Sequence, residues 1–166
     1  MLESLKKYRQ LCKKIDVFAE KLLKKHADSI HCAPGCSECC ILETLFPIEA
    51  YSIGNGVKKF SAVTRKWLQR NSKNRNRKLC VFLKSGKCLV YSFRPIICRT
   101  QGYPLLLDGR VDFCPKNFQG VRSLDGASIL ELETITTLLV KINMLFVREM
   151  GKEHDENIRV KLSDVV

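Results

Sequence analysis

The chain has no long apolar segment free of charge, which excludes an ordinary membrane-spanning helix. Its longest apolar region, residues 129–147, is interrupted by two glutamates, a lysine and an asparagine, whereas a bilayer span requires about 20 consecutive, predominantly apolar residues. The first ten residues, MLESLKKYRQ, carry charge where a secretion signal has its apolar core. We therefore expect a cytoplasmic protein in a reducing environment.

Aromatic residues are missing from the most basic part of the chain. Residues 69–78 are polar, basic and aperiodic, which predicts an exposed loop or linker. Surfaces that stack nucleobases combine aromatic side chains with basic ones, and this segment has no aromatic residue. Of the 29 Lys and Arg residues, 17 lie in positions 1–78 against 7 acids. Nucleic-acid binding through the basic stretch 58–78 is therefore an open alternative that is not favoured.

Cysteine is the residue in excess, with nine in 166 residues. Eight of them form a dense run followed by a spaced series: Cys32, Cys36, Cys39, Cys40, Cys80, Cys88, Cys98 and Cys114. Thiolates this close repel one another unless a metal gathers them, and thiolate ligands select zinc, copper(I) or iron–sulfur centres. Because the count is odd and no secretion signal is visible, metal ligation is favoured over a disulfide scaffold.

The cysteine spacing does not fit two common metal motifs. The first three cysteines have the C-x3-C-x2-C spacing of radical-SAM enzymes, but Glu38 occupies the position of an aromatic residue and no βα repeat follows. A zinc ribbon requires paired CxxC motifs, and the later cysteines are spaced too widely. His31 adjoins Cys32 and is a weaker candidate for a ligand or for a hydrogen-bond donor to one, because histidines beside cysteines often have neither role. The three histidines define no catalytic pair, so we assign no catalytic residue.

Amphipathic helices are predicted on both sides of the cysteines. Apolar residues recur at helical spacing over residues 4–26. A second apolar helix is predicted over 126–149 and is expected to pack on the first. Cys12, the ninth cysteine, lies on the apolar stripe of the first helix, where a small buried side chain is favoured over a ligand. The tail after Gly151 is expected to be frayed.

Two shorter helices are predicted in the middle of the chain. Pro47 suits the first position of a helix that ends near Gly54. A further helix over 58–70 is expected to place Phe60, Val63, Trp67 and Leu68 on one face. Residues 41–46 are apolar and are expected to pack beneath the metal site.

Residues 80–114 are turn-rich and predict short strands. The segment from Cys80 to Cys88 predicts a hairpin closed around Gly86. Further strands are expected over 89–91 and 111–114. The hairpin would bring the second thiol back beside the first.

Two arginines bracket Cys98. Arg94 and Arg99 are expected to donate charge-assisted hydrogen bonds to the cysteine sulfurs, which would stabilise thiolates and adjust the properties of the centre. The alternative is that they form surface ion pairs. They are the residues assigned to cofactor binding besides the thiols.

The combined pattern resembles a known family. The eight spaced cysteines, with the pairs Arg94-Pro95 and Cys98-Arg99, resemble the cysteine-cluster family of zinc- or iron-chelating domains (the YkgJ-type family) over about residues 32–118. The resemblance implies a metal-chelating domain. A similar pattern occurs in flagellin lysine methylases, where an iron–sulfur centre is implied in methyl transfer, but this chain has little room for a methyl-donor site.

The sequence thus predicts a single domain over 1–166, α+β and mostly α. Helices at 1–31 and 126–149 would pack around a small irregular β-hairpin region, with the eight-cysteine metal cluster in the core at 32–118. The expected function is chelation of zinc or iron, with a 4Fe–4S cluster as one form, serving a structural role or a protein partner. The alternatives are an iron–sulfur-dependent methyltransferase- or redox-type enzyme and a nucleic-acid-binding module with a structural metal.

Overall fold

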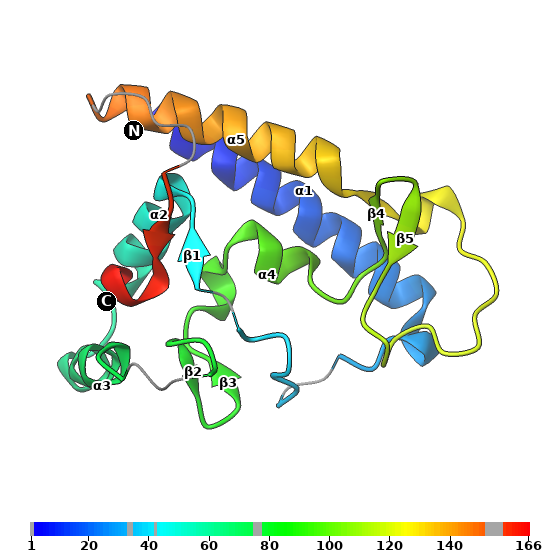
Figure 1. The fold of residues 1–166 in the computed structure, drawn as a ribbon, viewed down its shortest axis with the longest axis horizontal. Coiled ribbons are helices and arrows are strands. Elements are labelled where there is room, and N and C mark those ends of the chain that lie inside the picture. The colour runs from blue at the N-terminus through cyan, green and yellow to red at the C-terminus, as the bar shows by residue number, and fades with distance from the viewer. Residues whose placement is uncertain (1, 33–34, 42, 75–77, 152–157) are drawn as a thin grey trace.

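The two longest helices, α1 (Glu3–Lys25) and α5 (Leu132–Glu149), lie side by side along one edge of the molecule (Figure 1). The structure is a computed structural model. It describes residues 2–32, 35–41, 43–74, 78–151 and 158–166. The expected packing of the first helix on the last is confirmed, and the class, mostly α with small sheets, is as predicted. In the described residues no helix combines the length and apolarity needed to cross a membrane.

The apolar stripe of α1 explains why this helix packs as it does. Its residues recur every three or four positions, so they share one face. The buried side chains of that face are Leu5, Tyr8, Leu11, Cys12, Ile15, Ala19 and Leu22. Cys12 is 8% exposed, so its assignment to the core is confirmed. Facing residues of α5, together with Phe46, Ile48 and Ile96, complete this core.

Helix α5 begins later than the sequence predicted. Residues 126–131 form the 3-10 helix η3 (Gly126–Ser128) and strand β6 (Leu130–Glu131) instead of helix. Strand β6 pairs in parallel with β4 (Leu105–Leu107). The backbone groups of Leu130 and Glu131 are therefore used in strand pairing, and the helix starts only at Leu132.

Helix α2 (Pro47–Val57) starts at the predicted proline but continues past Gly54 to Val57. The Glu49 side chain accepts a hydrogen bond from the Phe46 backbone N–H at 3.2 Å, which satisfies a donor at the helix start. Its other carboxylate oxygen accepts from the Ile96 N–H at 2.9 Å. Glu49 is only 3% exposed, and burial raises its pKa despite these bonds.

Helix α3 (Ala62–Ser72) begins after Ser61, whose hydroxyl oxygen accepts from the Thr64 N–H at 3.2 Å. Leu68 is fully buried, whereas Val63 is 76% exposed. The prediction that both lie on one face is therefore wrong, because Val63 lies on the first turn and faces away from the core. The helix also includes residues 69–72, which were predicted as linker; positions 75–77 lie outside the described residues.

The predicted Cys80–Cys88 hairpin is confirmed. Strands β2 (Leu83–Lys84) and β3 (Lys87–Cys88) pair antiparallel. The two residues between them have positive φ angles, 49° at Ser85 and 73° at Gly86, which is the geometry of a type I′ turn.

A second hairpin joins β4 to β5 (Arg110–Asp112). The strand predicted over 111–114 therefore ends at Asp112, and Cys114 lies beyond it. The strand predicted over 89–91 is wrong. Residues 89–90 form a turn and Tyr91–Phe93 form the 3-10 helix η2, because the Phe93 N–H bonds the Val90 carbonyl.

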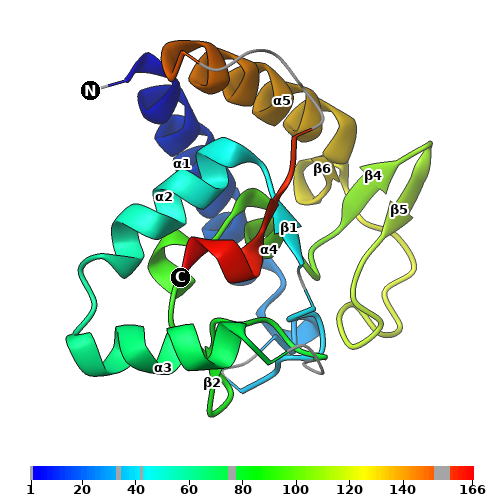
Figure 2. The same ribbon diagram turned by 60° about the vertical axis from the view of Figure 1, so that its left-hand side comes forward.

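The described end of the chain packs on the body of the protein. Strand β7 (Val160–Lys161) pairs with β1 (Thr44–Leu45), and the 3-10 helix η4 (Leu162–Val165) lies against α2 (Figure 2). Leu162 is 3% exposed. The expectation of a frayed tail is therefore wrong for these residues, since their apolar side chains complete the core between α2 and the β2–β3 hairpin. Residues 152–157, also covered by that expectation, lie outside the described residues.

Candidate metal centre

The eight spaced cysteines lie on loops, turns and short elements around the end of α1 and the β2–β3 hairpin. Cys98 alone is helical, in the five-residue α4 (Ile96–Thr100). Four are exposed and four are half-buried. None of the nine cysteines, all of which the structure describes, forms a disulfide bond. Of the apolar segment 41–46, expected beneath this region, Leu45 and Phe46 are buried, Ile41 is 62% exposed, and residue 42 is outside the described residues.

Gly102 brings the first and last of these cysteines together. A Cβ placed on Gly102 would lie 3.3 Å from the Cys32 Sγ and 3.5 Å from the Cys114 Cβ, so both side chains approach the same point. The residue has φ +87°, a conformation that glycine adopts without steric cost. The Cys114 N–H also bonds the Gly102 carbonyl at 3.4 Å. A glycine here therefore permits an approach that a side chain would obstruct.

Asn117 fixes this arrangement with its side-chain amide. It is 1% exposed. Its Nδ2 donates to the Gly102 carbonyl at 2.8 Å and lies 3.4 Å from the Cys32 Sγ, while its Oδ1 accepts from the His31 N–H at 2.9 Å. One buried amide thus orients the Cys32 loop against the segment that carries Cys114. Sequence reasoning missed Asn117; its position three residues after a candidate ligand was the one available signal.

A salt bridge makes a second link between the same two segments. Lys116 donates a hydrogen bond to the carboxylate of Glu38, which lies between Cys36 and Cys39. This bond raises the pKa of Lys116, and the nearby thiols of Cys36 and Cys114 act in the same direction. The dense cysteine run therefore faces Cys114.

Cys40 turns toward the hairpin. The Cys80 N–H donates to the Cys40 carbonyl at 2.6 Å, which places these two residues side by side. The Leu83 N–H bonds the Cys80 carbonyl at 3.1 Å, and Leu83 is the strand partner of Cys88. The hairpin thus brings Cys88 back near Cys80, as predicted.

Cys98 approaches the same group of thiols. Burial of its sulfur raises the pKa to about 12, and repulsion from Cys80, Cys88 and Cys40 adds to the increase. The residue as a whole is nevertheless exposed. Burial also raises the pKa of Cys88, while the charge of Arg94 opposes that increase.

Cys39 and Cys40 lie where the two groups of thiols meet. Burial is the main cause of the raised pKa of each thiol. Repulsion from Cys40 is the second-largest cause of the raised pKa of Cys39. For Cys40, the second-largest cause is repulsion from Cys88. The two adjacent thiols also interact with each other.

The cysteine side chains are of the type that binds a soft metal, and they come from segments that lie near one another. In the described residues they do not form a complete set of ligands around one point. Zinc and iron–sulfur centres take cysteine thiolates as ligands, and the contacts above gather thiols from separate segments of the chain. Within the part of the chain that the structure describes, no three His, Cys, Asp or Glu side chains are close enough to hold a metal ion. The thiols are therefore grouped but are still apart.

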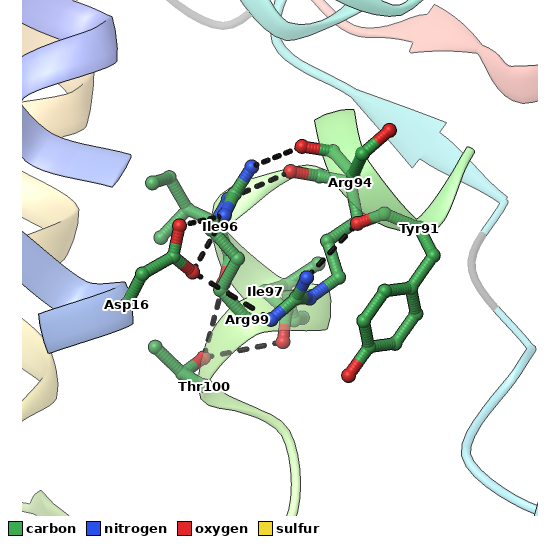
Figure 3. Close-up of polar contacts among 8 residues, drawn as sticks. Asp16, Tyr91, Arg94, Ile96, Ile97, Arg99 and Thr100 are labelled. Atoms are coloured by element: carbon green, nitrogen blue, oxygen red, sulfur yellow. Dashed lines mark hydrogen bonds and ion pairs between the residues drawn. The ribbon is translucent and has the colours of Figure 1, made fainter. Parts of the chain in front are cut away.

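Arg94 and Arg99, the two arginines predicted to contact the cysteines, form hydrogen bonds and ion pairs with carboxylate and carbonyl oxygen atoms (Figure 3). Arg99 is buried and donates to the Asp16 carboxylate at 2.6 Å, to the Arg94 carbonyl at 2.9 Å and to the Ser92 carbonyl at 3.4 Å. Arg94 donates to the Tyr91 carbonyl at 2.9 Å, stacks over its ring, and pairs with Asp16 at 3.6 Å. The pair joins α1 to α4, and Arg94 lies near enough to Cys88 to act on its charge. Hydrogen bonds from these arginines to sulfur stay a prediction.

Comparison with protein families finds a match for the part of the chain that carries the cysteines. A family model named CxxCxxCC, described as "Putative zinc- or iron-chelating domain", matches residues 31–115. Those residues contain all eight spaced cysteines. Searches of curated proteins and of solved structures gave no match.

Proposed function

The chain belongs to the CxxCxxCC family of zinc- or iron-chelating domains, which covers residues 31–115, and we propose that its eight spaced cysteines hold the metal. The observation that carries this proposal is the convergence of thiols from distant parts of the chain. Cys32 meets Cys114 at Gly102, and Cys40 meets Cys80 through a backbone hydrogen bond. Packing alone gives no reason to gather thiols whose ionised forms repel.

Burial raises the pKa of several of these thiols, and three groups of the protein act against that increase or beside it. The Asn117 amide lies 3.4 Å from the Cys32 sulfur, where it would donate a hydrogen bond to a thiolate. The ammonium group of Lys116 lies near Cys36 and Cys114, and the charge of Arg94 partly opposes the increase that burial causes in the pKa of Cys88. Zinc bound here would supply structural cross-linking, whereas an iron–sulfur cluster would supply electron transfer.

Two hollows on the described part of the chain lie away from the cysteines. They are lined by residues of β4, β5 and α5 and of the turns beside them, and no cysteine lines either one. A cluster-dependent enzyme needs room for a substrate beside the metal. A structural or metal-supplying role in the cytoplasm, where thiols remain reduced, requires no such pocket.

The proposal is tested by changing Cys36, Cys39, Cys88 and Cys98 individually to serine. Each variant is expected to lose metal and to melt at a lower temperature, because metal binding contributes directly to folding free energy. Cys12→Ser is the matched control: the residue is buried in the α1 core, so the variant should lose stability but keep its full metal content. Zinc and iron analysis with thermal unfolding measures both quantities.

The Cys12→Ser control also shows how metal loss in the other variants is to be interpreted. If Cys12→Ser lost metal as the other variants do, the loss would reflect general unfolding. If all four loop and hairpin variants kept their metal, these thiols would not be its ligands.

A further inference from the structure

Two sets of contacts link the segments that carry the eight spaced cysteines. Cys32 and Cys114 approach one point at Gly102. The Lys116–Glu38 salt bridge draws the turn that bears Cys36 and Cys39 toward the same segment. The loop set is therefore Cys32, Cys36, Cys39 and Cys114.

The remaining four cysteines cluster at the hairpin. The Cys80 N–H bond to the Cys40 carbonyl joins the end of the dense run to the hairpin base. The β2–β3 pairing returns Cys88 to that base. Cys98 is placed there by α4, where it interacts with the other three thiols. The hairpin set is therefore Cys40, Cys80, Cys88 and Cys98.

We infer that the loop set and the hairpin set hold two separate but neighbouring metal centres, one with four thiolates from each set. This inference rests on the proposed function and adds the number of centres and the ligands of each. Four thiolates are the number that a structural zinc ion or a 4Fe–4S cluster takes. Each set also has its own nearby cation, Lys116 for the loop set and Arg94 for the hairpin set.

The two centres would adjoin each other at the Cys39–Cys40 peptide. Cys39 interacts mainly with Cys40, Cys32 and Cys36, whereas the thiol that acts most on Cys40 is Cys88. The tips of the two segments also meet, since a Cβ on Gly86 would lie 3.7 Å from the Gly35 Cα. A single backbone step thus separates ligands of different centres.

Three double variants with equal loss of thiols test the grouping. Cys32→Ser/Cys114→Ser removes two ligands of the loop set, and Cys80→Ser/Cys88→Ser removes two of the hairpin set. Cys88→Ser/Cys114→Ser removes one ligand from each. Zinc, iron and acid-labile sulfide per chain are measured in protein purified without oxygen, together with alkylation of the remaining thiols read by mass spectrometry.

The native protein is expected to hold two equivalent units of metal. Each within-set variant should keep about half, and its intact set should stay protected from alkylation. The cross-set variant should lose nearly all the metal and expose both sets. Far-UV circular dichroism checks that α1 and α5 remain folded in all three.

Equal metal loss in the three variants, or one unit of metal in the native protein, would overturn the grouping while leaving the proposed function intact. A native protein without zinc or iron would instead contradict the proposed function itself. The two failures are therefore distinguishable.

Discussion

Two regions of the molecule are stabilised in different ways. The helical part, consisting of α1, α2 and α5, surrounds a core of buried apolar side chains. The described residues of the cysteine part, 32, 35–41, 80–88 and 96–117, form turns, two-residue and three-residue strands and one five-residue helix, and half of its eight thiols are exposed.

This difference indicates where the stability of each region comes from. Burial of apolar area contributes roughly 25 cal/mol per Å², which supports the helical part without any ligand. The cysteine part has short elements joined by single contacts such as those at Gly102 and Asn117. We therefore expect its ordering to depend on the metal, because ligand binding is coupled to folding in small metal domains.

Metal removal should have the largest effect and should be confined to the cysteine part. Structural zinc contributes about 10–16 kcal/mol in zinc-finger peptides, more than any single side chain here. We expect amide hydrogen exchange to accelerate across residues 32–41, 80–88 and 96–117 after chelation, while α1 and α5 stay protected. Equal acceleration in α1 and α5 would remove the distinction between the two parts.

A substitution in the apolar core should lower the stability of the helical part and leave the metal content unchanged. Ile48 is fully buried in the helical part, so Ile48→Ala should cost about 2–5 kcal/mol of unfolding free energy without lowering the metal content. Val63→Ala is the control, because Val63 is 76% exposed and its truncation should change stability by less than about 0.5 kcal/mol. Urea unfolding with metal analysis measures both. Metal loss in folded Ile48→Ala protein would mean that the parts are not independent.

Substitution of Gly102 should weaken metal binding more than it lowers the stability of the fold. Gly102→Ala and Gly109→Ala both place a side chain at positive φ, +87° and +73°, at a cost of about 1–2 kcal/mol each. Only at Gly102 would the new Cβ meet a thiol, the Cys32 sulfur at 3.3 Å. Competition with a chelator should therefore show weaker metal retention in Gly102→Ala alone. Equal retention in the two variants would exclude a role for this close approach.

The smallest effect is expected at Asp125, which joins α1 to η3. The hydrogen bond from Lys25, helped by one from Ser128, lowers the pKa of Asp125 from 3.8 to about 2. Because the folded pKa is lowered, its stabilising contribution is present above about pH 4 and is lost as the pH falls toward 2. The stability difference between the native protein and Asp125→Asn should shrink over that range in urea unfolding. A difference that stayed constant down to pH 2 would contradict this ion pair.

The helices were predictable because their signals are local. The apolar stripe of α1 and the proline at the start of α2 are visible in short windows of sequence. The start of α5 was not, since the pairing of β6 with β4 joins residues about 25 positions apart. Val63 was misplaced because helical spacing alone does not say where a face ends.

The candidate ligands could be named from the sequence, but the contacts between the segments that carry them could not be predicted. Cysteine spacing identifies candidate ligands without specifying which distant segments meet. Asn117 contacts Cys32 across 85 positions, and Cys40 meets Cys80 through the backbone. The oxygen partners of Arg99 were equally hidden, because Asp16 lies on α1, 83 residues away.

The central claim is that the clustered cysteines hold a metal, and metal analysis of anaerobically purified protein tests it most directly. Zinc, iron and acid-labile sulfide are measured per chain alongside the absorption spectrum. The account predicts either stoichiometric zinc without visible absorption or iron with matching sulfide and a broad visible band. A fully folded protein with neither metal, whose eight spaced thiols all react freely, would contradict it.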